Sequence, residues 1–374
     1  MTDNAVEPAG QTRPLQIAFD GNIPAFLGVV IINLVLTVVT LGIYRFWAKT
    51  RVRHYLWENT TFDGEPLEYR GRGLELLIGA VLAFLIFLLP AIAFSLGETA
   101  LRASGHIVVA ALLELRVFGG IYYLFGVGFY RAERYLISRT SWRGIRGGMT
   151  KGGWRYGGLF LKMALFQAVT LGFGRPYAQI RLWNARMNDL MFGSAQAMSE
   201  AKWRPLFRRY VLTQIAAIVV IVGAVALVAG DFASLAPQLQ AGGAHPDPRT
   251  MLPLLAKLYG VFILAGIVIA LIMLSYHAAY YREIFSKTRL EGVEFAFAAT
   301  TGAWLRYYVV NALIVVLTLG LGLMIMPLRA WAFYMRNIRT VGFLDTENLM
   351  QTQLASPSQG EGIADALGIS ILPF

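Results

Sequence analysis

Seven apolar stretches constrain the fold of this chain more than any other feature of its sequence. Each approaches the roughly 20 residues that an α-helix needs to cross a lipid bilayer. A water-soluble protein would have to bury them all beneath a polar surface, yet only 15% of the residues are charged and 56% are hydrophobic. The sequence therefore predicts a membrane protein, with apolar stretches at Ile23–Ile43, Leu74–Leu96, Ile107–Phe129, Leu159–Phe173, Leu206–Ala229, Leu252–Leu274 and Tyr307–Met326.

Positive charge is concentrated between these stretches. The connections at residues 97–106 and 230–251 hold one Lys or Arg each. Basic connections favour the cytoplasmic side of a membrane, so the net charge of +11 indicates topology before it indicates nucleic-acid binding. Of the 33 bases, 27 lie in five other connections, at residues 44–73, 130–157, 174–209, 281–306 and from 328 onward.

Seven simple crossings cannot place all five basic connections on one side of the membrane. The conflict disappears if the first, fourth and seventh stretches enter from the cytoplasmic side, turn, and return as helical hairpins. The other four stretches then cross as two pairs, which puts both chain termini in the cytoplasm. All eight tryptophans lie in or beside the basic connections, which indicates an aromatic-rich cytoplasmic interface.

The three stretches that are expected to turn back share a sequence motif. Each contains Thr-Leu-Gly, and in each an arginine lies nine residues beyond the glycine. Glycine frees the backbone, and the threonine hydroxyl can satisfy a carbonyl that a helix break leaves unpaired. Close helix packing by small residues is the alternative interpretation. The helix-break hypothesis assigns the turns to Thr40 and Gly42, Thr170 and Gly172, and Thr318 and Gly320.

A second pattern flanks these stretches. Asn59-Thr60, Arg139-Thr140 and Lys287-Thr288 are each followed, four residues after the threonine, by a glycine. Alternating apolar residues follow two of these glycines, which is typical of short strands. The pattern predicts small cytoplasmic β-hairpins between the membrane helices.

Together these features predict an all-α polytopic membrane protein. It would contain three divergent internal repeats, with helical hairpins broken at Thr-Leu-Gly and short cytoplasmic β-hairpins. The expected boundaries are a polar N-terminal tail at 1–14, repeat units at 15–105, 106–230 and 252–345, an extracytoplasmic loop at 231–251, and a flexible C-terminal tail at 346–374.

The first repeat unit carries a more specific resemblance. Its residues Asn33, Thr40-Leu41-Gly42-Ile43-Tyr44-Arg45-Phe46-Trp47-Ala48, Arg53-His54-Tyr55 and Asn59-Thr60 with Gly64 resemble the YjgN family, which carries domain of unknown function 898. The resemblance covers about residues 15–345 and excludes the tail from Ser356. It implies a multi-pass protein of the bacterial inner membrane. It brings no activity, substrate or catalytic residue.

Six arginines beside the Thr-Leu-Gly motifs are candidates for binding an anion or a lipid headgroup. Arginine suits phosphate and carboxylate because its planar guanidinium forms paired hydrogen bonds. Equivalent arginines would converge on one anion if the three units packed around a pseudo-threefold axis. In the alternative interpretation, each contacts lipid phosphates at the membrane surface. The residues are Arg45, Arg51, Arg53, Arg175, Arg181 and Arg329.

Charged residues inside the apolar stretches form a second candidate set. A charge that faces lipid is costly, so such residues usually pair between helices or line a functional path. Lysines can also extend to the interface. The candidates are Glu114, Arg116, Lys162 and Lys257.

The sequence contains no motif typical of a metal, nucleotide or nucleophile site, so we expect no enzyme, no metal and no cofactor. Two functional hypotheses remain. The repeats, broken helices and intramembrane charges favour a transporter or channel-like protein for an anionic or amphipathic solute. The alternative is a non-transporting protein that binds lipids, anionic ones in particular, or scaffolds partners through its basic, Trp-rich face. Neither hypothesis involves nucleic acid.

Overall fold

The computed structural model describes residues 15–240 and 248–342. The predicted tails at 1–14 and 346–374, and the middle of the predicted loop at 231–251, lie outside the described residues.

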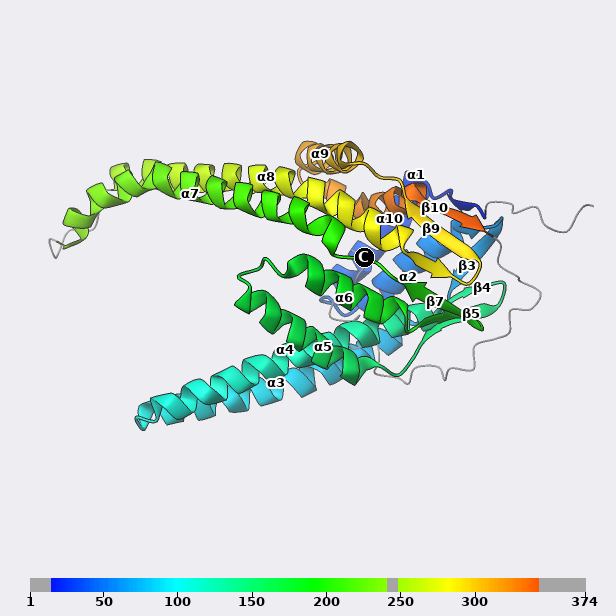
Figure 1. Cartoon of the computed structure of the whole chain (residues 1–374), viewed down its shortest axis with the longest axis horizontal. Coiled ribbons are helices and arrows are strands. Elements are labelled where there is room, and N and C mark those ends of the chain that lie inside the picture. Colours follow the sequence, from blue (N-terminus) through cyan, green and yellow to red (C-terminus); the bar gives the residue numbers. More distant parts are fainter. Residues whose placement is uncertain (1–14, 241–247, 343–374) are drawn as a thin grey trace, which may run out of the picture.

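Helices are arranged in consecutive pairs that alternate with short strands (Figure 1). The 3-10 helix η1 (Leu321–Ile325) precedes the last helix. Within the described residues the five pairs are α1 (Ile23–Val39) with α2 (Arg45–Glu58), α3 (Gly73–Ala103) with α4 (Ile107–Ser138), α5 (Gly153–Val169) with α6 (Arg175–Met187), α7 (Arg204–Gln240) with α8 (Pro248–Ser286), and α9 (Thr301–Leu317) with α10 (Met326–Asn337).

In the described part of the chain, ten strands form one antiparallel sheet whose order follows the sequence. The sheet lies at one end of the molecule, and the helix pairs extend from it (Figure 1). The strands are β1 (Ile17–Phe19), β2 (Thr60–Phe62), β3 (Glu65–Tyr69), β4 (Thr140–Trp142), β5 (Ile145–Met149), β6 (Leu190–Phe192), β7 (Ala195–Ser199), β8 (Thr288–Leu290), β9 (Val293–Phe297) and β10 (Ile338–Gly342).

This sheet shows that the predicted all-α class is wrong. The tight turns are readable from sequence: Asp63-Gly64 and Arg143-Gly144 have both residues at positive φ, as a two-residue β-hairpin requires. The pairing between successive hairpins is not. For example, Tyr69 of β3 lies opposite Thr140 of β4, although the α3–α4 pair separates them in sequence. No local pattern encodes that register, so isolated hairpins were expected where one continuous sheet exists.

The sheet curves until its last strand approaches its first. The Thr340 hydroxyl in β10 donates a hydrogen bond to the carbonyl of Leu15, which precedes β1. The rings of Trp57 in α2 and Trp331 in α10 also stack, with centroids 4.4 Å apart. Side chains therefore join the two ends of the described chain.

Threonines at the start of three strands explain the second sequence pattern. Each hydroxyl donates to the carbonyl four residues earlier, at the end of the preceding helix. Each also accepts the indole N–H of a tryptophan from another helix pair. These bonds are Trp331 to Thr60 at 2.7 Å, Trp57 to Thr140 at 3.0 Å and Trp183 to Thr288 at 3.2 Å.

Burial of the tryptophans corrects the interpretation of the aromatic interface. Trp57, Trp142, Trp304 and Trp331 are at most 5% exposed and belong to the core between the helix pairs and the sheet. Trp154, by contrast, is 56% exposed. The one-sided distribution of tryptophan therefore arises largely because the compact core lies on one side of the chain's apolar helices.

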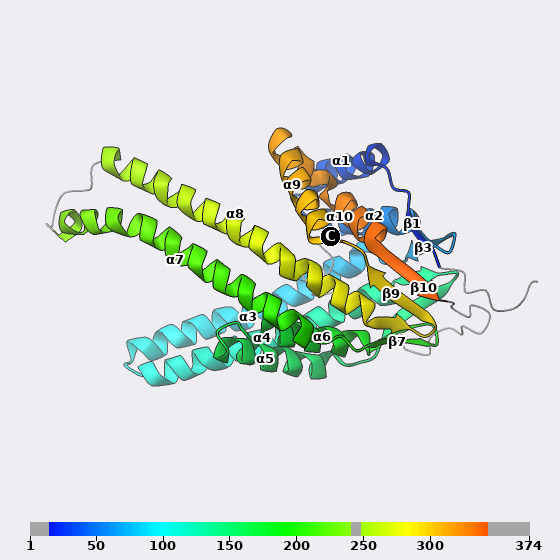
Figure 2. The same cartoon turned by 45° about the horizontal axis from the view of Figure 1, so that its top comes forward.

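Length and apolar character divide the helices into two groups. Among the described residues, three helical segments are long and apolar enough to cross a membrane: Ile107–Ser138, Arg204–Asp231 and Met251–Ser286. Figure 2 shows α3–α4 and α7–α8 leaving the sheet toward the same side. By contrast α1, α5 and α9 have 17 residues each, about 25 Å of helix. These shorter helices lie at the lower limit of length for a membrane crossing.

We predict that Trp331→Phe destabilises the protein by about 1–2 kcal/mol, because the variant loses the hydrogen bond to Thr60 and part of the stack on Trp57. Thermal unfolding of the purified protein in detergent measures the effect. Trp154→Phe is the matched control and should change stability by less than about 0.5 kcal/mol, since its ring is largely exposed. Equal shifts for the two variants would contradict a special role for the junction.

Candidate functional site

The three Thr-Leu-Gly segments have the same backbone conformation. Leu41, Leu171 and Leu319 have φ values of 50°, 49° and 51°, and the glycines that follow have 91°, 84° and 92°. Each glycine N–H bonds the carbonyl five residues earlier at 2.7 or 2.8 Å. This bond is the six-to-one hydrogen bond that ends a helix in a Schellman motif. We call these three segments the hairpin turns.

The threonine hydroxyl links the two helices at each hairpin turn. Thr40 donates to the Leu36 carbonyl at 2.7 Å and accepts the Tyr44 N–H at 2.9 Å. Thr170 and Thr318 form the same two bonds, with distances of 2.6–2.9 Å. The carbonyl at the end of the first helix already accepts a backbone N–H, so the hydroxyl gives it a second hydrogen bond. The hydroxyl also satisfies an N–H at the start of the next segment, which would otherwise need water or another capping residue.

The leucine of each hairpin turn has a strained backbone conformation and an exposed side chain. A left-handed conformation brings Cβ close to the following carbonyl and costs about 1–2 kcal/mol for residues other than glycine. Even so, Leu41, Leu171 and Leu319 are 94%, 83% and 95% exposed. No packing within the described structure offsets that strain. Their apolar side chains form the tip of each hairpin.

The candidate arginines occupy different environments. Arg51 and Arg329 line separate grooves. Arg51 lies between α1 and α2, and Arg329 lies between α9 and α10 in a groove that Gly21 and Ile23 also line. Arg181 is exposed on α6. Arg45 and Arg175 are exposed first residues of α2 and α6. These arginines are therefore distributed over three hairpins.

Arg53 differs from the other five because it is buried. Its Nη1 donates to the Tyr69 hydroxyl at 3.2 Å, and its guanidinium carbon lies 5.7 Å from the centre of that ring. These contacts join α2 to β3. Arg53 therefore supports the attachment of the first hairpin to the sheet.

Two of the four intramembrane charges have partners near the far ends of the long helix pairs. Glu114 pairs with Arg102 at 3.0 Å, and Lys257 pairs with Asp231 at 2.6 Å. These contacts join α4 to α3 and α8 to α7. Arg116 and Lys162 are exposed on α4 and α5.

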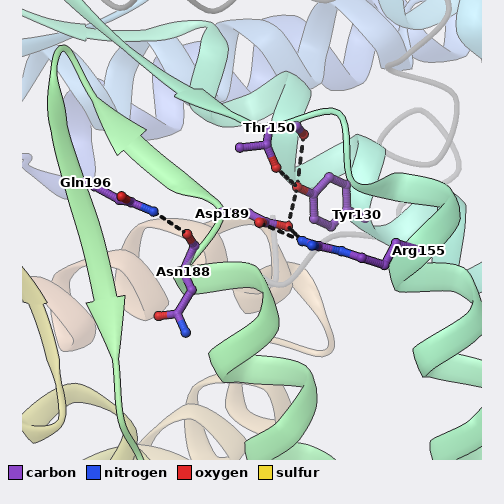
Figure 3. Close-up of polar contacts among 6 residues, drawn as sticks. All are labelled: Tyr130, Thr150, Arg155, Asn188, Asp189 and Gln196. Atoms are coloured by element: carbon purple, nitrogen blue, oxygen red, sulfur yellow. Dashed lines mark hydrogen bonds and ion pairs between the residues drawn. The ribbon is translucent and has the colours of Figure 1, made fainter.

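A polar cluster that sequence reasoning missed joins α4, α5 and the end of α6 (Figure 3). The Asp189 carboxylate accepts a bond from the Tyr130 hydroxyl at 2.9 Å and bonds from Arg155 at 2.8 Å to both oxygens. The Tyr130 hydroxyl also lies 2.9 Å from the Thr150 carbonyl. Glycine at 152 permits this approach, because a Cβ there would lie 2.8 Å from Asp189 Oδ2. The partners lie 34 and 59 residues from Asp189, so no short motif marks the cluster.

This cluster orders the chain around the second hairpin. Nearby, Gln196 donates to the Asn188 carbonyl at 3.0 Å, which ties β7 to the end of α6 (Figure 3). The interactions of Asp189 raise the pKa of the Arg155 guanidinium above its usual range. Both oxygens of Asp189 are already engaged, so the cluster acts as a structural junction.

A buried ion pair fixes α6 to α4. Arg186 Nη1 lies 3.2 Å from Glu133 Oε2, and both side chains are less than 10% exposed. The Arg186 guanidinium also lies 4.8 Å from the centre of the Phe129 ring. Because buried charges require partners, this contact sets the position of the second hairpin.

Comparison with known proteins identifies relatives of the chain. A family model described as "Bacterial protein of unknown function (DUF898)" matches residues 14–366. The curated "Inner membrane protein YjgN" of Salmonella typhimurium is 23% identical over 203 residues, or 51% of this chain. That match spans about half of the relative, 48% of its length. No solved structure matches the chain.

We predict that Arg186→Ala destabilises the protein by about 3–5 kcal/mol, because Glu133 is left buried without its partner. Denaturant or thermal unfolding in detergent provides the measurement. Arg102→Ala breaks two partly exposed ion pairs, with Glu98 and Glu114, and is expected to cost about 1 kcal/mol or less. Similar losses for both variants would show that the Glu133 contact is not special.

We predict the opposite sign for Leu319→Gly, which should stabilise the protein in detergent by about 1 kcal/mol. Glycine relieves the left-handed strain, and the exposed side chain gives up no internal packing. The leucine side chain contacts detergent in both the folded and the unfolded chain, so that contact does not contribute to the difference. The control is Leu317→Gly, two residues earlier and also exposed, but at the end of α9 with helical geometry. That change should destabilise by about 0.5–1 kcal/mol. Loss of stability in both variants would refute the assignment of strain.

Proposed function

We propose that this chain, which belongs to the DUF898 family of bacterial proteins of unknown function, is a multi-pass inner-membrane protein. We also propose that it binds anionic phospholipids in the cytoplasmic leaflet. The apolar helices and the name of the Salmonella relative support the location. The basic connections beside the strands support a cytoplasmic position for the sheet and for both chain termini.

In this arrangement the two long helix pairs cross the membrane and the three short hairpins do not. Each short hairpin begins beside the sheet and turns back after 17 residues, or about 25 Å. The hydrocarbon core alone is about 30 Å thick. The hairpin turns would thus lie within the bilayer while their basic second helices return to the cytoplasmic surface.

The observation that carries the proposed position of the hairpins in the membrane is the strained, exposed leucine at all three hairpin turns. In water, such a residue would cost conformational energy and expose an apolar side chain. In lipid, burial of a leucine side chain contributes about 2 kcal/mol, which offsets the strain. All three hairpins have an exposed leucine in this conformation, which supports contact between the hairpin tips and the bilayer.

We further propose that the three short hairpins are divergent copies of one unit. The shared Thr-Leu-Gly, the equivalent arginines and the matching threonine hydrogen bonds support a common origin. The scheme of three repeat units and the boundaries given above remain a prediction.

Anionic lipid is favoured over a transported solute because Arg51 and Arg329 line separate open grooves. Transport of an anionic or amphipathic solute is the second proposal, supported by helices that break inside a membrane region. Flux of a labelled anion into liposomes would favour transport. Retention of anionic lipid by the purified protein without flux would favour lipid binding.

We predict that nitroxide labels on Leu41→Cys, Leu171→Cys and Leu319→Cys report a lipid environment in reconstituted vesicles. Collisions with oxygen should exceed those with a water-soluble nickel complex. The natural chain has no cysteine, so each label is unique. The control Ser194→Cys, at the exposed turn between β6 and β7, should report water. Water-exposed labels at the three tips would refute the proposed membrane placement.

A further inference from the structure

The groove between α9 and α10 has the composition of an anion site. Its volume is about 630 Å³. One face of each helix lines it, at the three- and four-residue spacings of neighbouring turns. We call it the α9–α10 groove; its principal lining residues are Arg306, Tyr307 and Val310 from α9, and Arg329, Phe333 and Arg336 from α10.

Positive charge in this groove is not balanced by its walls. Among residues 15–240 and 248–342, those that line the groove include three arginines and no carboxylate. Arg329 is oriented by a 2.5 Å bond from its Nε to Asn311 Oδ1, while Arg306 and Arg336 are exposed. Three like charges on one small surface repel each other, and an anion that contacts all of them removes that repulsion. Guanidinium groups match the oxygen geometry of phosphate.

The first hairpin supplies a natural comparison. Alignment on the hairpin turns places Gly28, Arg51 and Glu58 where the third hairpin has Arg306, Arg329 and Arg336. A groove of about 530 Å³ lies at the same position between α1 and α2, and all three residues line it. Glu58, which lies 3.9 Å from His54, adds a carboxylate to the groove that contains Arg51. The two grooves therefore share a geometry and differ in charge.

The apolar surface beside the α9–α10 groove indicates the source of the anion. Val310, Leu328 and Phe333 form part of its wall, and α9 continues to the exposed Leu317 and the tip residue Leu319. Arg306 lies 11 residues before Leu317, about 16 Å along the helix. That distance is close to half the thickness of a hydrocarbon core. A basic groove next to an apolar helix surface matches a phospholipid, with its phosphate in the groove and its chains along α9.

We propose that the α9–α10 groove binds the phosphate of an anionic phospholipid through Arg306, Arg329 and Arg336. This inference rests on the proposed lipid-binding function and assigns it to one of the three hairpins. Arg306 and Arg336 distinguish this groove, because the equivalent residues are Gly28 and Glu58 in the first hairpin and Gly158 and Asn188 in the second.

Native mass spectrometry of the delipidated full-length protein, titrated with phosphatidylglycerol or phosphatidylcholine, tests the site. We expect the wild type to prefer phosphatidylglycerol. The double variant Arg306→Gly/Arg336→Glu gives the third hairpin the residues of the first and should weaken the tightest phosphatidylglycerol binding at least tenfold. The reciprocal variant Gly28→Arg/Glu58→Arg should add a second tight binding event; a Cβ at residue 28 meets no atom within 4 Å.

Unchanged affinity in the first double variant, with its thermal unfolding also unchanged, would overturn the site while leaving the proposed function intact. If the wild type did not prefer phosphatidylglycerol over phosphatidylcholine, the proposed function would fail as well. Glycerol 3-phosphate serves as the soluble probe. Displacement of phosphatidylglycerol by this compound at equimolar concentration would identify a free phosphate ester as the ligand and overturn the lipid assignment.

Discussion

The hydrogen bonds between tryptophans and the threonines that begin strands hold the helix pairs to the sheet. Strands of three to five residues are too short to hold a hairpin together in water on their own. The strands from β2 to β9 gain stability from neighbours on both sides, and helix ends pack on the sheet. At Thr60 one hydroxyl connects the end of α2, the start of β2 and Trp331 of α10. Without this contact the first and last helix pairs would lose a direct link.

Sequence reasoning identified much of the local structure and little of its assembly. Apolar length, the Asp63-Gly64 and Arg143-Gly144 turns, and the Thr-Leu-Gly positions are local signals, and each corresponds to a feature of the structure. The register of β3 against β4 depends on how α3 and α4 place the two strands, so it has no local signal. The strand β6 begins with Leu190, whereas β2, β4 and β8 each begin with a threonine. The sequence pattern built on that threonine therefore did not include the β6–β7 hairpin.

The same difference between local and non-local signals applies to the candidate site. The arginines nine residues beyond the glycine of each hairpin turn were visible as a repeated spacing, and Arg329 lies in a groove with two further arginines. Arg306 and Arg336 were not singled out, because one belongs to the helix before the turn and the other follows Arg329 by two helical turns. Only the antiparallel packing of α9 and α10 brings them to a common surface. Arg53, in contrast, shares the sequence context of the exposed arginines, but its contact with Tyr69 places it in the core.

The order of the strands has a consequence for biosynthesis. Each strand pairs with its predecessor in the chain, so the sheet can grow in step with translation and each helix pair can enter the membrane as it emerges. The contact between Thr340 and Leu15 does not follow the order of synthesis, because 325 residues separate its partners. The start of the chain must therefore wait, with its neighbouring strand edge uncovered, until nearly the whole protein has been made. During that interval β1 lacks the contacts that it makes with β10 and α10, and its outer edge is accessible to a chaperone or a misplaced strand.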